Sequence, residues 1–169
     1  EDKANEEKHQ IALVMGRFAE SLRNANYLFG VSERPLHYFE PGCGDGFSTA
    51  KYIQTLLPSH PPGFVVHASD IMEQSVNRAY KNLDINGVEI AELDVKDAFA
   101  RSVMTGSPCD LALASHMVYH AQKIFEGVRL PRAEIGKRAD TMMANVMDSL
   151  KDNGLFVGLH ECSKSHLSG

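Results

Sequence analysis

The sequence predicts one α/β domain built on a doubly wound parallel sheet, and three observations predict it. Short apolar runs of the buried-strand type alternate with segments of helical periodicity, which is typical of right-handed parallel β-α units. Several of these runs end in an acidic residue that precedes a turn or a helix start. The 169 residues, 43% of them hydrophobic and 23% charged, suffice for one globular domain with a full core.

Residues 1–30 form the first predicted unit, a helix that either packs against the sheet or covers the site as a lid. One face of this helix is apolar, and its residues are Ile11, Val14, Met15, Phe18 and Leu22. Residues 31–169 form the second predicted unit, the sheet-forming core.

A glycine-rich turn follows the first predicted strand, which ends at Glu40. Gly42, Gly44 and Gly46 alternate along this turn before a segment of helical type. Glycine permits positive φ and lets a ligand approach the main chain, while the helix start offers unpaired N–H groups. The pattern predicts a site for a nucleoside-type cofactor. Phe47 stands where a dinucleotide site has glycine or alanine, which disfavours a nicotinamide dinucleotide.

The later elements repeat the strand-then-helix order. The expected strands after the first are residues 64–70, 88–95, 109–115 and 155–160, and the expected helices are 72–83 and 133–150, with 151–154 as the helix stop. Asp70 and Asp94 close two of these strands, so both are expected at the rim that Glu40 occupies. The two oxygens of Asp70 suit the two hydroxyls of a ribose. Each acid also fits a simpler role as a helix cap.

The run E-x-G-x-G-x-G from Glu40 to Gly46 resembles motif I of the class I S-adenosylmethionine (SAM)-dependent methyltransferases. Residues 109–120 look like motif IV of that family, and residues 149–157 are similar to its passage into strand five. The resemblance covers roughly residues 36 to 160 and favours the small-molecule type. It implies a Rossmann-like sheet of order 3-2-1-4-5, SAM as the cofactor and S-adenosylhomocysteine as the product.

The resemblance also implies which residues bind the cofactor. Glu40 would lie near the methionine end, Asp70 would take the ribose, and Asp94 would take the adenine amino group while the next backbone N–H meets the ring. The full implied set is Glu40, Gly42, Cys43, Gly44, Asp70, Ile71, Asp94, Val95 and Ser115. Strands six and seven of the family have no counterpart in the few residues after the fifth strand, so we expect a core without them.

The residues after the fourth strand are expected beside the methyl donor, and His116, Tyr119 and His120 are the candidate catalytic residues. Three interpretations stay open. The histidines cap and pack the loop, or one of them orients or deprotonates the substrate, or they bind a metal together with His160 and Glu161. The Asp- and Asn-rich ligands of cation-dependent O-methyltransferases are not seen, so no metal is expected.

The composition narrows the classes of partner and the compartment that we expect. The net charge of −5 disfavours nucleic acid, and no apolar run approaches the roughly 20 residues that cross a bilayer. The charged N-terminal segment has no signal-peptide core, and Cys43, Cys109 and Cys162 form no C-x-x-C pair, which fits a reducing compartment. We therefore expect a cytoplasmic protein with a small-molecule methyl acceptor, and neither a membrane nor a nucleic-acid partner.

The expected activity is transfer of a methyl group from SAM to oxygen or nitrogen of that acceptor. Two other functions stay open. A nicotinamide-dependent oxidoreductase is the first, and Phe47 and Asp94 argue against it. A non-catalytic SAM-fold module that binds or acts as a scaffold is the second.

Overall fold

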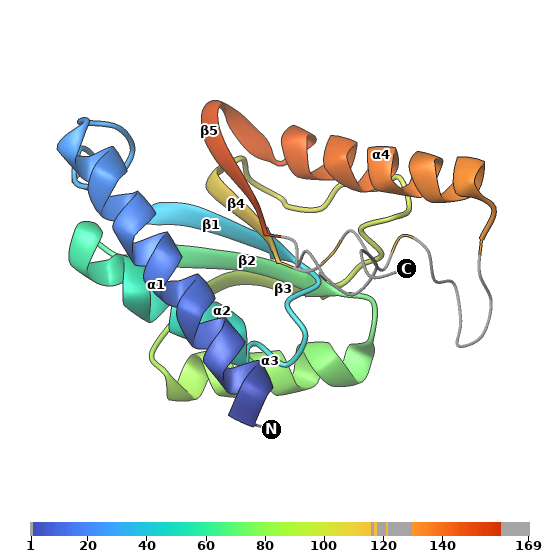
Figure 1. Ribbon diagram of the computed structural model, residues 1–169, viewed down its shortest axis with the longest axis horizontal. Coiled ribbons are helices and arrows are strands. Elements are labelled where there is room, and N and C mark those ends of the chain that lie inside the picture. The colour runs from blue at the N-terminus through green and yellow to red at the C-terminus, as the bar shows by residue number, and fades with distance from the viewer. Residues whose placement is uncertain (1, 116, 118–120, 122–129, 160–169) are drawn as a thin grey trace, which may run out of the picture.

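A five-stranded, all-parallel sheet with the order β3-β2-β1-β4-β5 forms the centre of the molecule, as the computed structural model shows (Figure 1). The structure describes residues 2–115, 117, 121 and 130–159. The strands are β1 (Leu36–Pro41), β2 (Phe64–Asp70), β3 (Glu89–Val95), β4 (Cys109–Ser115) and β5 (Leu150–Leu159). The α/β class and the strand order predicted from the sequence are confirmed.

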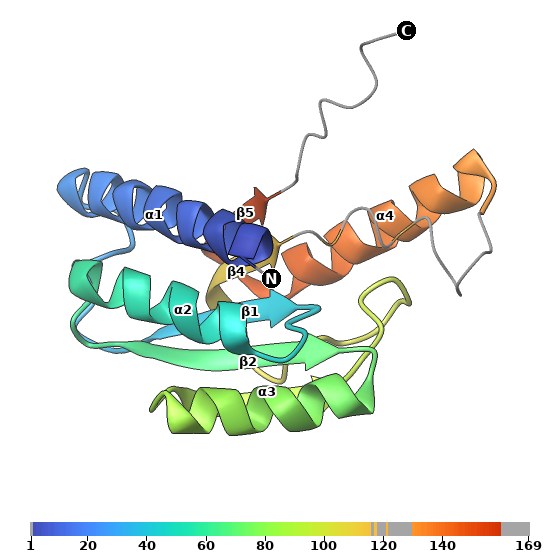
Figure 2. The ribbon, with the colours of Figure 1, turned by 60° about the horizontal axis from the view of Figure 1, so that its bottom comes forward.

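Helices cover both faces of the sheet (Figure 2). The helices are α1 (Asp2–Asn24), α2 (Phe47–Leu56), α3 (Glu73–Ile85) and α4 (Arg132–Asp148), with a short 3-10 helix, η1 (Leu57–Ser59). One core cluster joins α1, α2 and α3 to the face of β1 that carries Leu36 and Tyr38. A second joins α4 to the opposite face through Phe39. Because β1 is buried on both faces, its adjacent residues Tyr38 and Phe39 each enter a core cluster, one on either side of the sheet.

Helix α1 packs against the core through three of the five predicted residues, Ile11, Met15 and Leu22, together with small residues that the pattern did not include. Ala12, Met15 and Ala19 are buried, whereas Val14 is 59% and Phe18 is 42% exposed. Gly16 lies close to α2, because a Cβ built on it would be 3.1 Å from the methyl carbon of Thr55. The apolar periodicity identified the helix and three residues of its packed face, and it was wrong for Val14 and Phe18.

The boundary between α4 and β5 also differs from the prediction. The helix ends at Asp148 instead of residue 150, and residues 151–154 belong to β5 instead of forming a separate turn. The Ser149 carbonyl accepts a hydrogen bond of 2.8 Å from the N–H of Cys109, which starts the pairing with β4. The register then shifts between Cys109 and Leu111, because β5 carries extra residues opposite this step. The segment predicted as a helix stop is therefore part of an irregular strand.

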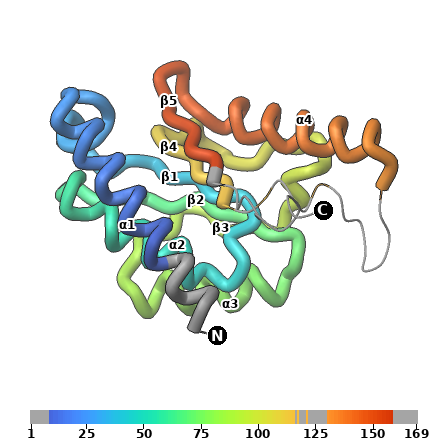
Figure 3. The backbone as a smooth tube through the Cα atoms, viewed as in Figure 1, coloured from blue at the N-terminus to red at the C-terminus, as the bar shows by residue number. Residues whose placement is uncertain are grey.

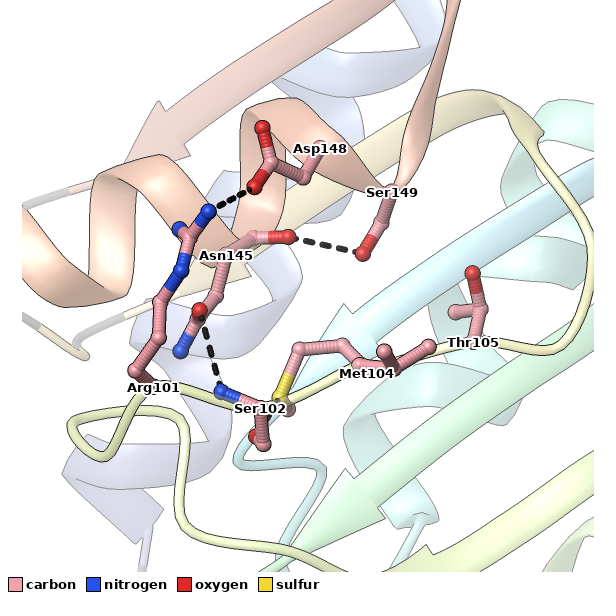
Figure 4. Close-up of a pocket in the computed structure, with 8 residues that line it drawn as sticks. Arg101, Ser102, Met104, Thr105, Asn145, Asp148 and Ser149 are labelled. Carbon is pink, nitrogen blue, oxygen red and sulfur yellow. Dashed lines mark hydrogen bonds and ion pairs between the residues drawn. The ribbon is translucent and has the colours of Figure 1, made fainter.

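The tube in Figure 3 shows the path of the segment between β3 and β4, which passes beneath α4. A cavity of about 260 Å³ lies between this segment and the end of α4 (Figure 4). Asn145 holds the segment through its Nδ2, which donates to the carbonyls of Ala98 (2.9 Å) and Ala100 (2.7 Å). Ser149 also lines this cavity, which places it at the amino end of β4, away from the rim where the predicted site lies.

Within the part of the chain that the structure describes, no helix has the length and apolar character that crossing a membrane requires.

Candidate functional site at the carboxyl ends of the strands

The turn after β1 exposes its main chain at Gly44. Gly44 has φ 58°, and a Cβ built on it would meet no atom within 4 Å, so open space lies in front of this residue. Gly46, with φ 75°, requires glycine for another reason. A Cβ there would lie 2.8 Å from Cα of Ala79 in α3. At Gly42 a side chain would collide with Met117. Alternating glycines therefore serve one exposed position and two tight packing positions.

Asp70 ties this turn to the end of β2. Its Oδ2 accepts a hydrogen bond of 3.0 Å from the Gly44 N–H, and its Oδ1 accepts one of 2.9 Å from the Met72 N–H. The Cys43 N–H donates to the Ser69 carbonyl at 2.9 Å, which adds a backbone link between the same two segments. The acid proposed to hold a ribose thus also shapes the turn. The bond to Met72 forms a turn just before α3, whose N-cap is Met72 without a side-chain cap, and the ribose contact stays a prediction.

Glu40 is in the core beneath the turn, not on the open rim. Only 3% of the residue is exposed, and its Oε2 accepts a hydrogen bond of 2.7 Å from the Tyr38 hydroxyl. Burial raises the pKa of the Glu40 carboxyl to about 7, although the hydrogen bond from Tyr38 opposes the rise. Near neutral pH this carboxyl is therefore present in both its protonated and its ionised form.

Cys43 is also buried, and burial strongly raises the pKa of its thiol. A neutral, enclosed thiol is neither a nucleophile nor a ligand for a cation. Any contact between Cys43 and a bound molecule would thus come from its main chain.

Asp94 closes β3 and forms an ion pair of 2.9 Å with Nζ of Lys96, which also bonds Glu92 at 2.8 Å. Nζ of Lys96 donates a further hydrogen bond to the Met104 carbonyl. Although partial burial acts in the opposite direction, the bonds to Glu92 and Asp94 raise the pKa of Lys96. Lys96 therefore stays charged and fixes the end of β3. Sequence reasoning did not single out this lysine, because Glu92 lies in a strand and Lys96 directly after it, where the i, i+4 rule for helices gives no signal.

Apolar side chains are bare beside the two rim acids. Ile71 is 61% exposed and follows Asp70, while Val95 is 52% exposed and follows Asp94. Met72 adds a third exposed apolar side chain at 56%. Exposed aliphatic groups next to hydrogen-bonding carboxylates form a surface suited to a flat ring with polar edges.

The structure also shows two further positions that the sequence analysis discussed, Ser115 and Phe47. Ser115 ends β4 at the same rim and is partly exposed. Phe47, at the start of α2, is 49% exposed, so it lies outside the core. The candidate catalytic residues His116, Tyr119 and His120 lie outside the described residues, as do His160 and Glu161. Met117, which sequence reasoning did not single out, is buried against the α4 side of the sheet.

The strand pairing brings Asp70, Asp94 and the glycine turn to one edge of the sheet, whereas Glu40 is buried beneath it. The pairing of Ser69 with Asp94 and of Asp70 with Val95 places the ends of β2 and β3 side by side. Pro41, just before the glycine turn, pairs with Ser69. The open space beside Gly44, two carboxylates and bare aliphatic side chains thus meet at the carboxyl ends of β1, β2 and β3, where open α/β sheets bind ligands.

Comparison with solved structures shows the same fold in methyltransferases. The DszA carbon methyltransferase matches 92% of this chain and 35% of its own, with a TM-score of 0.61 and 18% identity. The CurJ carbon methyltransferase matches 78% of this chain and 31% of its own, with a TM-score of 0.54 and 17% identity. An O-methyltransferase family protein from Burkholderia thailandensis matches 89% and 40%, with a TM-score of 0.53 and 14% identity.

The chain spans about a third of the length of these two carbon methyltransferases and two fifths of the O-methyltransferase family protein. No protein-family model matches the sequence, and no curated protein sequence matches it. At these identities the likeness establishes the fold, a Rossmann-like one that these methyltransferases share.

Proposed function

We propose that the chain is the cofactor-binding core of a SAM-dependent methyltransferase that acts on a small-molecule acceptor. One observation carries the proposal: the exposed main chain at Gly44 lies at the same rim as Asp70, Asp94 and the bare side chains of Ile71 and Val95. A molecule with ribose hydroxyls and an adenine ring matches these groups in order along the rim.

The residues of the rim have separate tasks in this proposal. Asp70 accepts the ribose hydroxyls while it continues to hold the turn, and Asp94 accepts from the adenine amino group. Ile71 and Val95 enclose the ring and exclude water from it. The cofactor supplies an activated methyl group on a sulfonium, so the protein chiefly positions the acceptor and keeps the site dry.

The acceptor is proposed to be a small molecule that presents oxygen or nitrogen. The acidic net charge supports this choice over a nucleic acid, because a phosphate backbone requires a basic surface. Residues 116–120, with His116, Tyr119 and His120, are proposed to orient the acceptor or take its proton.

Calorimetric titration with SAM, S-adenosylhomocysteine and NADH tests the proposal. We expect micromolar binding of the first two and none of NADH. Asp70→Ala should weaken SAM binding by more than tenfold, since a carboxylate and the shape of the turn are lost together. Asp84→Ala, an exposed acid at the end of α3, is the matched control and should bind as the parent protein does. Binding of NADH in preference to SAM would instead favour an oxidoreductase.

Mass-spectrometric detection of methyl transfer from SAM to a panel of hydroxyl, amine and carbon-acid acceptors tests the chemistry. Tight SAM binding without transfer to any of them would favour a binding or scaffold module.

A further inference from the structure

Glu40 is a buried carboxyl group without a cationic partner among the described residues. It is 3% exposed, and the interactions that set its ionisation come from burial and from hydroxyl groups. A carboxylate enclosed in this way is costly because no counter-charge offsets the lost hydration. The site is therefore arranged so that Glu40 accepts a proton when nothing positive is near.

The groups that act on Glu40 and on its neighbours Tyr38 and Cys43 are neutral or acidic. Tyr38 lies beside it on β1, Tyr52 of α2 acts on Tyr38, and Cys43 lies in the turn. Asp45 of the turn and Asp70 of β2 act on Cys43 as further acidic groups. Helix α1 and strand β4 contribute apolar side chains to this core cluster. No cation from these groups stabilises the ionised form of Glu40.

The position of Glu40 makes its ionisation sensitive to a bound cation. It lies in β1 directly before the turn whose main chain is exposed at Gly44. At an effective dielectric constant of about 20, a unit positive charge roughly 7 Å away lowers a carboxyl pKa by between one and two pH units. The effect therefore does not require direct contact, and it reaches a group that already titrates close to neutrality.

We propose that Glu40 senses the charge on the sulfur of the bound cofactor, so that the site exchanges a proton with solvent in each cycle and discriminates the cofactor from its product. This inference rests on the proposed function. Glu40 gives its proton to solvent when the sulfonium binds. In methyl transfer a lone pair of the acceptor would form the new bond to the methyl carbon, and the electron pair of the broken S–C bond would stay on sulfur, which would thus become neutral. Glu40 then takes a proton back from solvent, and the anionic form that favoured the sulfonium is lost.

The inference has a quantitative consequence for binding. With a carboxyl half protonated near pH 7, SAM binding should release about 0.4 to 0.5 proton at that pH, and S-adenosylhomocysteine should release less than half as much. The dissociation constant of SAM should fall about five- to tenfold between pH 6 and pH 8. That of S-adenosylhomocysteine should change much less, because both ligands carry the same amino and carboxyl groups and differ in the sulfonium.

Calorimetry at pH 7.0 in phosphate and in Tris, which differ in ionisation enthalpy, measures the released protons directly on the full chain. Larger proton release for SAM than for S-adenosylhomocysteine supports the inference. Equal release, or none, with SAM still bound would overturn it and leave the proposed function intact. Failure of both ligands to bind would overturn the proposed function as well, so the two failures are distinct.

Two variants assign the proton to Glu40. Glu40→Gln should abolish the difference between the two ligands, whereas Asp140→Asn, an exposed acid of α4, should preserve it. Tyr38→Phe removes a hydrogen bond that favours the carboxylate, so it should move the pH dependence of SAM binding to higher pH. Tyr38→Phe also provides the assignment if Glu40→Gln does not fold. An unchanged pH dependence in either folded variant would show that another group releases the proton.

Discussion

The Gly44 N–H donates a hydrogen bond of 3.0 Å to Oδ2 of Asp70, so the end of β2 holds the turn that follows β1. The two residues belong to neighbouring parallel strands and their loops, and the link positions the exposed main chain of the turn. Loss of the Asp70 carboxylate therefore changes the turn as well as the proposed ribose contact. Replacing a glycine of the turn is the complementary way to separate the effect of the turn's shape from that of the carboxylate.

Gly44→Ala should chiefly weaken SAM binding, whereas Gly46→Ala should chiefly lower the unfolding free energy. Gly44→Ala places a methyl group in open space, so it should cost about 1 kcal/mol of unfolding free energy through its positive φ, yet weaken SAM binding at least tenfold. Gly46→Ala should cost about 2 to 3 kcal/mol, because its methyl group meets the backbone of Ala79. Urea denaturation and calorimetry measure both quantities. SAM binding unchanged in Gly44→Ala would argue against contact at this turn.

Asp110 should be one of the most important acids for stability. Its carboxylate accepts bonds from Arg34 (2.7 Å), Lys151 (2.7 Å) and the His37 N–H (2.8 Å). Asp110→Asn should lower the unfolding free energy by about 2 to 4 kcal/mol, because two cations lose their counter-charge. Asp148→Asn, which breaks an exposed pair with Arg101, should cost about 0.5 kcal/mol or less. Similar losses in the two variants would contradict this ranking.

The same carboxylate predicts part of the acid response. Although burial acts against ionisation, the bonds from Arg34 and Lys151 lower the pKa of Asp110 to about 2 from 3.8. A lowered acid pKa means that the native state binds fewer protons than the unfolded state in this window. The contribution is therefore complete above pH 3.8 and disappears as the pH falls through about 2. Acid titration of unfolding should show this loss in the parent protein and not in Asp110→Asn.

The pair formed by His37 and His67 should make stability pH-dependent below pH 6.5. Nδ1 of His37 lies 2.9 Å from Nε2 of His67, so one ring donates and the other accepts. Burial first, and then the neighbouring His67, lower the pKa of His37. The native state thus resists protonation, and this contribution is lost as the pH falls below 6.5. The loss of unfolding free energy caused by His37→Gln, measured by urea denaturation, should be smaller at pH 5.5 than at pH 7.5. The change caused by His9→Gln, at an exposed residue, should be the same at both pH values.

Asn145 should stabilise the segment between β3 and β4. Besides its bonds to two carbonyls, its Oδ1 accepts from the Ser102 N–H at 3.4 Å. Asn145→Ala should lower the unfolding free energy by about 2 to 3 kcal/mol. Asn145 is only 1% exposed, and the carbonyls of Ala98 and Ala100 lose the donor that it supplies. Met147→Ala, on the exposed side of the same helix, should change stability by about 0.5 kcal/mol or less. Thermal and urea unfolding measure the difference, and equal effects would show that the segment does not depend on Asn145.

The positions of the strands and of the rim acids were predictable because they depend on local patterns. Apolar runs that end in Asp70 and Asp94 fix where β2 and β3 stop, and parallel pairing then brings the two acids to one edge. The side-chain partners of those acids were not predictable in the same way. The reach of Lys96 to Met104 and of Asp70 to Gly44 depends on how loops fold over the rim.

His60 illustrates the same limit. In the sequence it is a histidine in a proline-rich loop, where a surface position is the natural expectation. In the structure it is fully buried, its Nδ1 accepts from the Gly30 N–H, and its Nε2 bonds the Arg34 carbonyl. The ring connects two segments that are remote in sequence. No local pattern carries that information.

By itself the sequence determined an α/β chain with five parallel strands, a glycine turn after the first, and acids at the ends of the next two, because periodicity and glycine placement act within a few residues. Only the tertiary structure decided that Glu40 is buried against Tyr38, and that α1 packs through Ala12 and Ala19. Burial and charge environment depend on residues far apart in the chain. For that reason the ionisation of Glu40, on which the proposed proton exchange depends, follows from the packed molecule.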